Sequence, residues 1–350
     1  MINQDTKASG ETPRLPTRPE GPRLPIASGR KELGIFILLV ALCIFVEAMS
    51  GGTFFHVDNL QNTSQIIGQY GIFSIGMGIV IITSGIDLSV GSLFALLGVL
   101  LAMMLTQWHW PWPLAVLAVL VGGALIGLFQ GALITKANLQ PFIVTLCGLL
   151  AYRGLARTIT NDSTVGFGSA KGFEPLQHLA TGNVFGFPNS FVILIVIALI
   201  MSVLLHRSVY GRYLYAVGRN EEAARYSGVN SNRIITGAYV ISGLLAGVAA
   251  ILIAFYTNSI SPSTHGQSYE LYGIAAAVLG GCSLRGGEGS IIGILLGTAL
   301  LQVLRNLVNL VQIGGHNIPS SAEAIVVGVV ILLGVAADEL IKRRSARKVR

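Results

Sequence analysis

The chain has 350 residues, of which 52% are apolar and only 11% carry a charge. Soluble domains usually contain roughly 25% charged residues, so this composition excludes an ordinary soluble enzyme. A hydrocarbon layer about 30 Å thick requires roughly 20 apolar residues per helix, and the sequence contains such runs many times. The composition therefore predicts an all-α fold, a polytopic bundle of membrane-spanning helices.

The charged residues gather in three stretches, residues 1–32, 207–233 and 338–350. The first stretch contains closely spaced prolines, which would break a helix, and it lacks the pattern of a signal peptide. We predict a disordered cytoplasmic tail over residues 1–32, a transmembrane domain over 33–341 and a basic cytoplasmic tail over 342–350.

Apolar runs bounded by helix-breaking residues predict about ten transmembrane helices. The third and the eighth are short for a full crossing. In chain order the runs lie near residues 33–49, 63–83, 90–105, 113–134, 141–160, 189–206, 233–256, 269–281, 290–310 and 320–341. On the fourth run Gly123, Gly127 and Gly131 recur every four residues, a spacing that lets helix backbones approach closely in lipid.

The basic residues predict the orientation, because Lys and Arg favour the cytoplasmic side of a membrane. With the N-terminus inside, both termini and the basic loop 207–232 are cytoplasmic. Two turns, 85–89 and 283–289, each have two interpretations. They are either tight cytoplasmic loops or re-entrant breaks, and the second interpretation leaves eight full spans.

The sequence lacks the residue patterns that several classes of enzyme and metal-binding protein require. The three cysteines are far apart, the histidines are isolated from one another, and there is no GxxxxGK[ST], HExxH or GxSxG motif. We therefore expect no catalytic residue, no bound metal and no cofactor, and any ATP must be hydrolysed by another chain. Because the basic residues cluster at membrane edges, we also expect no nucleic-acid partner.

One short cytoplasmic helix is predicted from capping residues in the loop 207–232. Asn220 is a good N-cap, acidic residues follow it, helix formers come next, and Gly228 suits the position after the helix. The residues concerned are Asn220, Glu221, Glu222, Ala223, Ala224, Arg225 and Gly228. So short a helix is unstable alone, so either the membrane surface or a partner protein must hold it.

Several segments of the chain resemble the sugar-importing ABC permeases of the ribose and xylose type. The segments ITSGIDLSVGS at 82–92 and YGRYLYAVGRNEEAA at 210–224 carry the resemblance most specifically. PFIVTL at 141–146, YRG at 152–154 and GGEGS at 286–290 add to it, and together the matches span roughly residues 35–340.

The resemblance implies a subunit of the bacterial inner membrane that provides the path for a monosaccharide or similar neutral polyol. It implies three protein partners: a cytoplasmic ATPase, a periplasmic sugar-binding protein and a second permease, identical or related. In that family the loop between the sixth and seventh helices docks on the ATPase, which agrees with a short helix at 220–227 that needs a partner.

Polar residues inside apolar runs are the candidates for the translocation path. Asp87, with hydrogen-bonding help from Thr83, Ser84 and Ser89, either forms a gate near the inner mouth or caps the third helix; we favour the cap. Arg153 and Arg157 share one face of the fifth helix and either line the outer vestibule or reach lipid phosphates.

The ninth helix carries a polar stripe, because Gln302, Arg305, Asn306 and Asn309 follow helical spacing. A polar stripe must face protein or water inside a membrane, so it lines a pore or bonds to other helices. The competing function is a stand-alone ion-coupled secondary transporter or channel. Such a protein needs its own ion-coupling site near mid-membrane, for which Asp87 is the only plausible acid.

Overall fold

The structure is a computed structural model that describes residues 28–313 and, beyond them, 316–317, 319, 322, 324–325, 328–329 and 332. The predictions for the tail before residue 28, for most of the helix near 320–341 and for the basic tail 342–350 concern residues outside this described part.

Helices account for most of the described chain. The first six are α1 (Ser28–Met49), α2 (Val57–Ile82), α3 (Val90–Thr106), α4 (Trp112–Lys136), α5 (Pro141–Ile159) and α6 (Glu174–Thr181). The next six are α7 (Asn189–Arg207), α8 (Val209–Arg219), α9 (Glu221–Tyr226), α10 (Ser231–Thr257), α11 (Tyr269–Leu279) and α12 (Ile291–Leu310). Two antiparallel hairpins, β1 (Asn183–Val184) with β2 (Phe187–Pro188) and β3 (Gln312–Ile313) with β4 (His316–Asn317), complete the elements.

Among the described residues, seven helices are long and apolar enough to cross a membrane: α1, α2, α4, α5, α7, α10 and α12. The chain is thus a polytopic helical membrane protein. Their bounds lie close to the predicted runs, although α1 begins at Ser28, inside the stretch predicted as a tail. The helices α6 and α8 have no counterpart among the predicted elements.

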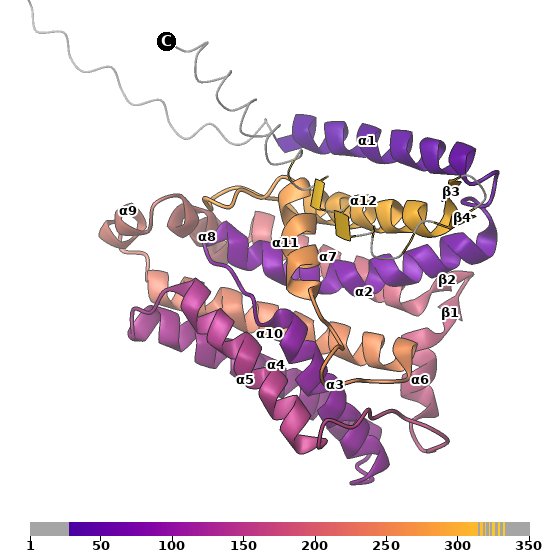
Figure 1. Cartoon of the computed structure of the whole chain (residues 1–350). Coiled ribbons are helices and arrows are strands. Elements are labelled where there is room, and N and C mark those ends of the chain that lie inside the picture. Colours follow the sequence, from indigo (N-terminus) through magenta and orange to yellow (C-terminus); the bar gives the residue numbers. More distant parts are fainter. Residues whose placement is uncertain are drawn as a thin grey trace, which may run out of the picture.

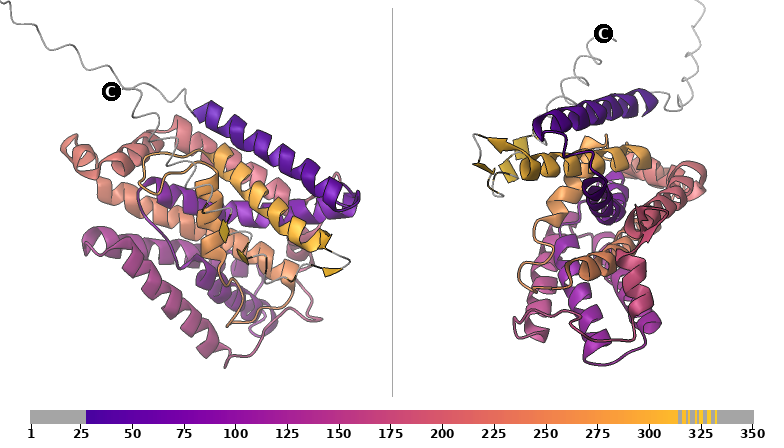
Figure 2. Two further views of the ribbon diagram at one scale, coloured as in Figure 1. Left: turned by 45° about the horizontal axis from the view of Figure 1, so that its top comes forward. Right: turned by 90° about the vertical axis from the view of Figure 1, so that its right-hand side faces the viewer.

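Two of these helices form the centre of the bundle. α2 and α10 are buried along most of their length, whereas α1, α4, α5 and α7 expose apolar side chains outward. α10 lies between α2 and α4, and α12 packs on α1 and α2 (Figures 1 and 2). The glycine spacing on α4 has the predicted effect, because a Cβ atom at Gly127 would lie 2.1 Å from the carbonyl oxygen of Tyr239 on α10.

The chain is interrupted twice near one end of the bundle. Residues 83–89, a turn at 83–84 followed by irregular backbone, separate α2 from α3, and residues 280–290 separate α11 from α12. With 11 residues, α11 is only about 16 Å long, too short to cross the hydrocarbon layer, and it runs across the direction of α2 and α12 (Figure 1).

The two ends of the bundle differ. At the α9 end lie α8, α9, the end of α2 and the start of α12; at the hairpin end lie the two hairpins and the start of the loop that follows α10 (Figure 1). A backbone bridge between Val165 and Ile260 joins two loops at the hairpin end. Because α2 and α12 run between these ends, their residues can be placed by depth.

Candidate functional site

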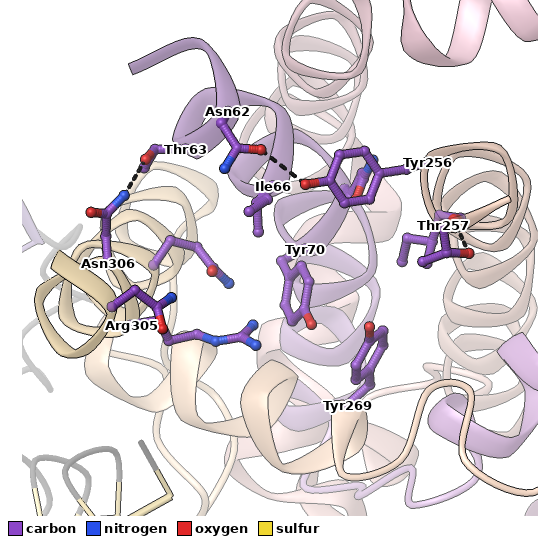
Figure 3. A pocket seen from close by; sticks show the side chains of 13 residues that line it. Asn62, Thr63, Ile66, Tyr70, Tyr256, Thr257, Tyr269, Arg305 and Asn306 are labelled. Atoms are coloured by element: carbon purple, nitrogen blue, oxygen red, sulfur yellow. Dashed lines mark hydrogen bonds between the residues drawn. The ribbon is translucent and has the colours of Figure 1, made fainter. Parts of the chain in front are cut away.

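A cavity of about 210 Å³ lies among α2, α10, α11 and α12, toward the hairpin end. Its walls combine aromatic rings with amide and hydroxyl groups, as Figure 3 shows. The side chains that line it include Asn62, Thr63, Gln69 and Tyr70 of α2, Tyr256 and Thr257 of α10, Tyr269 of α11, and Gln302, Arg305, Asn306 and Asn309 of α12. Among the described residues that line the cavity, none is acidic.

The predicted polar stripe of α12 faces this cavity. Gln302, Arg305 and Asn306 all line it, and Asn309 lies at the exposed edge. Asn306 also bonds to α2, since its Nδ2 donates to Asn59 Oδ1 at 2.9 Å and to Thr63 Oγ1 at 2.6 Å. The stripe therefore serves helix packing and cavity lining together, which were the two alternatives.

Arg305 is held between two aromatic rings. Its guanidinium carbon lies 5.1 Å from the ring centre of Tyr70 and 4.9 Å from that of Tyr272. Such cation–π contacts are worth roughly 0.5–2 kcal/mol, and they hold the planar group in a defined orientation. The charge of Arg305 is thereby accommodated in the half of the bundle toward the hairpin end.

Asp87 lies elsewhere, in the break between α2 and α3. It is 2% exposed, and its Oδ1 accepts hydrogen bonds from the backbone N–H of Ser89 at 2.9 Å and from the Ser89 hydroxyl at 2.7 Å. The Ser89 oxygen accepts in turn from Nε2 of Gln130 at 2.7 Å. Asp87 thus forms an Asx turn directly before α3, whose N-cap position is Ser89 and has no side-chain capping hydrogen bond. Thr83, Asp87 and Ser89 do not line the cavity.

The two arginines of α5 also lie away from the cavity. Arg153 donates hydrogen bonds to the backbone oxygens of Pro262 and His265, at 3.2 and 2.5 Å, and so fastens the loop 258–268. Arg157 forms an exposed ion pair with Asp162 at 2.7 Å. Neither arginine lines the cavity.

The short helix predicted at 220–227 is present as α9 (Glu221–Tyr226). The Asn220 side chain accepts a hydrogen bond from the backbone N–H of Ala223 at 2.9 Å, and Gly228 follows the helix with φ +86°. Glu221 pairs with Arg225 at 2.7 Å. The helix projects from the bundle (Figure 1), and the Tyr226 side chain is 91% exposed.

Directly before α9, the end of α8 meets both breaks in the bundle. The Ser84 hydroxyl lies 3.0 Å from the carbonyl oxygens of Gly218 and of Arg285, and the N–H of Gly287 donates to the Ile82 oxygen at 2.8 Å. We call this meeting of residues 82–84, Gly218 and 285–287 the three-way junction. The end of α8 is thereby in direct contact with the first interruption and adjoins the second.

The sequence analysis did not identify the wall of the cavity that α2 forms. Asn62, Ile66, Gln69 and Tyr70 share one face of α2, with the same helical spacing as the stripe on α12. The polar members of that face were a usable signal, because a buried polar group in a membrane helix must face protein or water. The contributions of Tyr256 and Tyr269 depend on tertiary packing and leave no such pattern.

The comparison with known proteins agrees with this architecture. The family described as "Branched-chain amino acid transport system / permease component" matches residues 59–335. The ribose import permease protein RbsC of Escherichia coli strain K12 is 40% identical over 302 residues, which cover 86% of this chain and 92% of that protein. No solved structure gives a significant match.

Two further relatives are named for other sugars. The fructose import permease protein FruF of Bifidobacterium longum is 32% identical over 326 residues, which cover 89% of this chain and 90% of that protein. The xylose transport system permease protein XylH of Escherichia coli is 31% identical, with 91% and 95% covered. The chain therefore belongs to this family of transport-system permease components.

Proposed function

We propose that the chain is the membrane-spanning subunit of an ATP-driven ABC importer and provides the path for a monosaccharide or similar neutral polyol. The single observation that carries this proposal is the similarity, over most of the chain, to import permeases named for ribose, fructose and xylose. A cavity lined by hydroxyl, amide and aromatic groups suits such a solute better than a branched apolar side chain.

The proposed topology places both termini in the cytoplasm of a bacterial inner membrane, with about ten helices in the transmembrane domain. The basic loop 207–232 contains α8 and α9, so the α9 end is the cytoplasmic one. The hairpin end then faces the periplasm, and the cavity lies in the outer half. The breaks at 83–89 and 280–290 are re-entrant in this arrangement, and the tenth helix lies largely outside the described residues.

The proposed ATPase partner docks on α9. A helix of six residues is far shorter than the roughly 12–15 needed for stability alone, and its exposed face carries Glu222 and Tyr226. The coupling segment comprises Asn220, Glu221, Glu222, Ala223, Ala224, Arg225 and Gly228. A periplasmic sugar-binding protein at the hairpin end and a second permease, identical or related, complete the proposed assembly.

Co-purification with an ATPase subunit, expressed together with this chain, tests the docking role. Tyr226→Ala removes an exposed aromatic side chain of the kind that dominates interfaces, and Glu222→Lys reverses an exposed charge. We expect each variant to lower ATPase recovery at least about tenfold, the effect of losing roughly 1.4 kcal/mol of binding. Lys171→Glu, an exposed charge reversal at the opposite end, is the control and should leave recovery unchanged. Equal recovery from all of these variants would remove α9 as the docking site.

A further inference from the structure

We propose that the cavity among α2, α10, α11 and α12 is a binding site at which the permease itself holds one sugar molecule, rather than a water-filled stretch of passive path. The inference rests on the proposed function for the class of cargo. Its basis is a buried amide donor without a hydrogen-bond partner, Nε2 of Gln69, on a residue that lines the cavity, together with the polar and aromatic side chains around it.

The Gln69 side chain is 1% exposed, and its amide donor has no acceptor within reach. Burying an unsatisfied polar group costs free energy, and such groups are rare in folded proteins. A ligand hydroxyl placed in the cavity would accept from this amide and remove that cost.

Asn306 holds the α12 wall of the cavity in place. Its Nδ2 donates to Asn59 and Thr63, which fixes the amide. The other lining groups are hydroxyls and amides. A hydroxyl group both donates and accepts, so a polyol can accept from Gln69 and donate to the lining oxygens, whereas a simple cation cannot accept and a simple anion cannot donate.

Aromatic rings supply the rest of a sugar site. The rings of Tyr70 and Tyr269 lie 4.9 Å apart, and the Tyr256 hydroxyl is held by Asn62 at 2.9 Å. Tyrosine combines a flat apolar ring with a polar tip, which matches the C–H faces and hydroxyl edges of a sugar ring. Arg305, stacked on Tyr70, presents a planar set of donors suited to neighbouring hydroxyls.

The cavity is closed toward the α9 end by aromatic side chains. Phe73 lies one turn beyond Tyr70 on α2, its ring centre 5.1 Å from that of Phe94 and 6.1 Å from that of Tyr269. Both phenylalanines are almost completely buried. This buried aromatic packing lies beyond Tyr70 on the way to the α9 end and argues against an open channel in this conformation.

The size of the cavity restricts the ligand. Its volume of about 210 Å³ is below the roughly 300–1,000 Å³ of pockets that take drug-sized molecules. We therefore assign a single monosaccharide, and exclude a disaccharide, as the occupant in this conformation.

Cysteine protection on the purified full-length permease, without its partners, tests the proposal. In a background with Cys43, Cys147 and Cys282 replaced by Ala, Asn309→Cys at the cavity edge is labelled with a charged thiosulfonate reagent. Ribose, xylose, fructose and L-leucine are each added in increasing concentration. We expect at least one sugar to slow labelling several-fold and saturably, and leucine to have no effect. Thr164→Cys, exposed outside the cavity, is the control and should react at the same rate throughout.

Gln69→Leu then tests the geometry. The variant should need at least about tenfold more sugar for protection, the loss expected for one hydrogen bond to a buried group. Its ligand-free Tm should not fall, because the amide donor it removes has no partner. Gln65→Leu, on the same helix but outside the cavity lining, should bind as the parent does.

Two results would overturn the inference. If no sugar protects Asn309→Cys while the assembled transporter still imports sugar with ATP, the cavity is a passive path and the proposed function stands. If Gln69→Leu is protected as well as the parent, the site is not built as described. Absence of ATP-driven uptake for every sugar tested would instead contradict the proposed function.

Discussion

At Gly218 the backbone of α8 comes so close to α2 that no other residue fits. A Cβ atom there would lie 1.7 Å from the Ile82 oxygen and 2.7 Å from the nitrogen of Gly287. We predict that Gly218→Ala forces the three-way junction apart and lowers stability by about 1–3 kcal/mol or more. Thermal unfolding of the purified protein in detergent measures this effect.

Gly154 of α5 supplies the matched control, because nothing lies within 4 Å of a Cβ atom built there. Gly154→Ala should leave the Tm unchanged or raise it slightly, since alanine favours helix. The same Tm for both alanine variants would contradict the close approach at the junction.

The titration of His265, in the loop 258–268, makes the stability of the folded protein depend on pH. Burial, with a smaller contribution from the positive charge of Arg153, lowers the pKa of His265 from 6.5 to about 4. Between these two pH values the imidazole of His265 is protonated in the unfolded chain but neutral in the folded chain. The stability this provides is complete above pH 6.5 and is lost as the pH falls toward 4, by up to about 3 kcal/mol.

We predict that His265→Asn makes the Tm less sensitive to pH between 7 and about 4, because asparagine does not titrate. The backbone oxygen that accepts from Arg153 is retained in the variant. Parallel Tm curves for the parent and the variant over this range would show that His265 does not control the acid sensitivity.

At the scale of elements, most helices could be predicted from the sequence because an apolar run in a membrane has few alternatives to a helix. The prediction for 113–134 became α4, and the capping residues around 220–228 correctly located α9. The run at 269–281, which is short for a full crossing, forms the 11-residue helix α11. Its direction across α2 and α12 depends on tertiary packing and leaves no pattern in the sequence (Figure 1).

Asp87 lies in the break between α2 and α3, and two substitutions of this residue distinguish the two roles considered for it. Asparagine keeps an oxygen that can accept from the Ser89 N–H and hydroxyl, so Asp87→Asn should retain most transport and nearly the parent Tm. Asp87→Leu leaves both Ser89 donors unpaired and should cost about 1–3 kcal/mol. Loss of uptake in Asp87→Asn with normal insertion and Tm would mean that the charge itself acts, as an ion-coupled transporter would require.

At the scale of the whole molecule, the cavity could be predicted only in part. The spacing on α12 identified Gln302, Arg305 and Asn306, and the same spacing on α2 identifies Gln69 once it is sought. The meeting of these two faces with α10 and α11 follows from how the helices cross, and no local pattern encodes that. The remoteness of Arg153 and Asp87 from the cavity has the same origin.

The two sites described here lie at opposite ends of the described bundle, and the central helix α2 connects them. Its half toward the hairpin end lines the cavity, and its last residue, Ile82, belongs to the three-way junction. We propose that a movement of α9 imposed by a partner reaches the cavity through α2 and the two breaks. The central claim is that an external ATPase, acting at α9, drives solute through this cavity.

Uptake of labelled sugar into proteoliposomes tests this claim most directly. One set contains the permease with its ATPase and sugar-binding protein and receives ATP; the other contains the permease alone under a proton or sodium gradient. We predict accumulation only in the first set, and its loss in the Tyr226→Ala variant. Accumulation by the permease alone, driven by the ion gradient, would contradict the account.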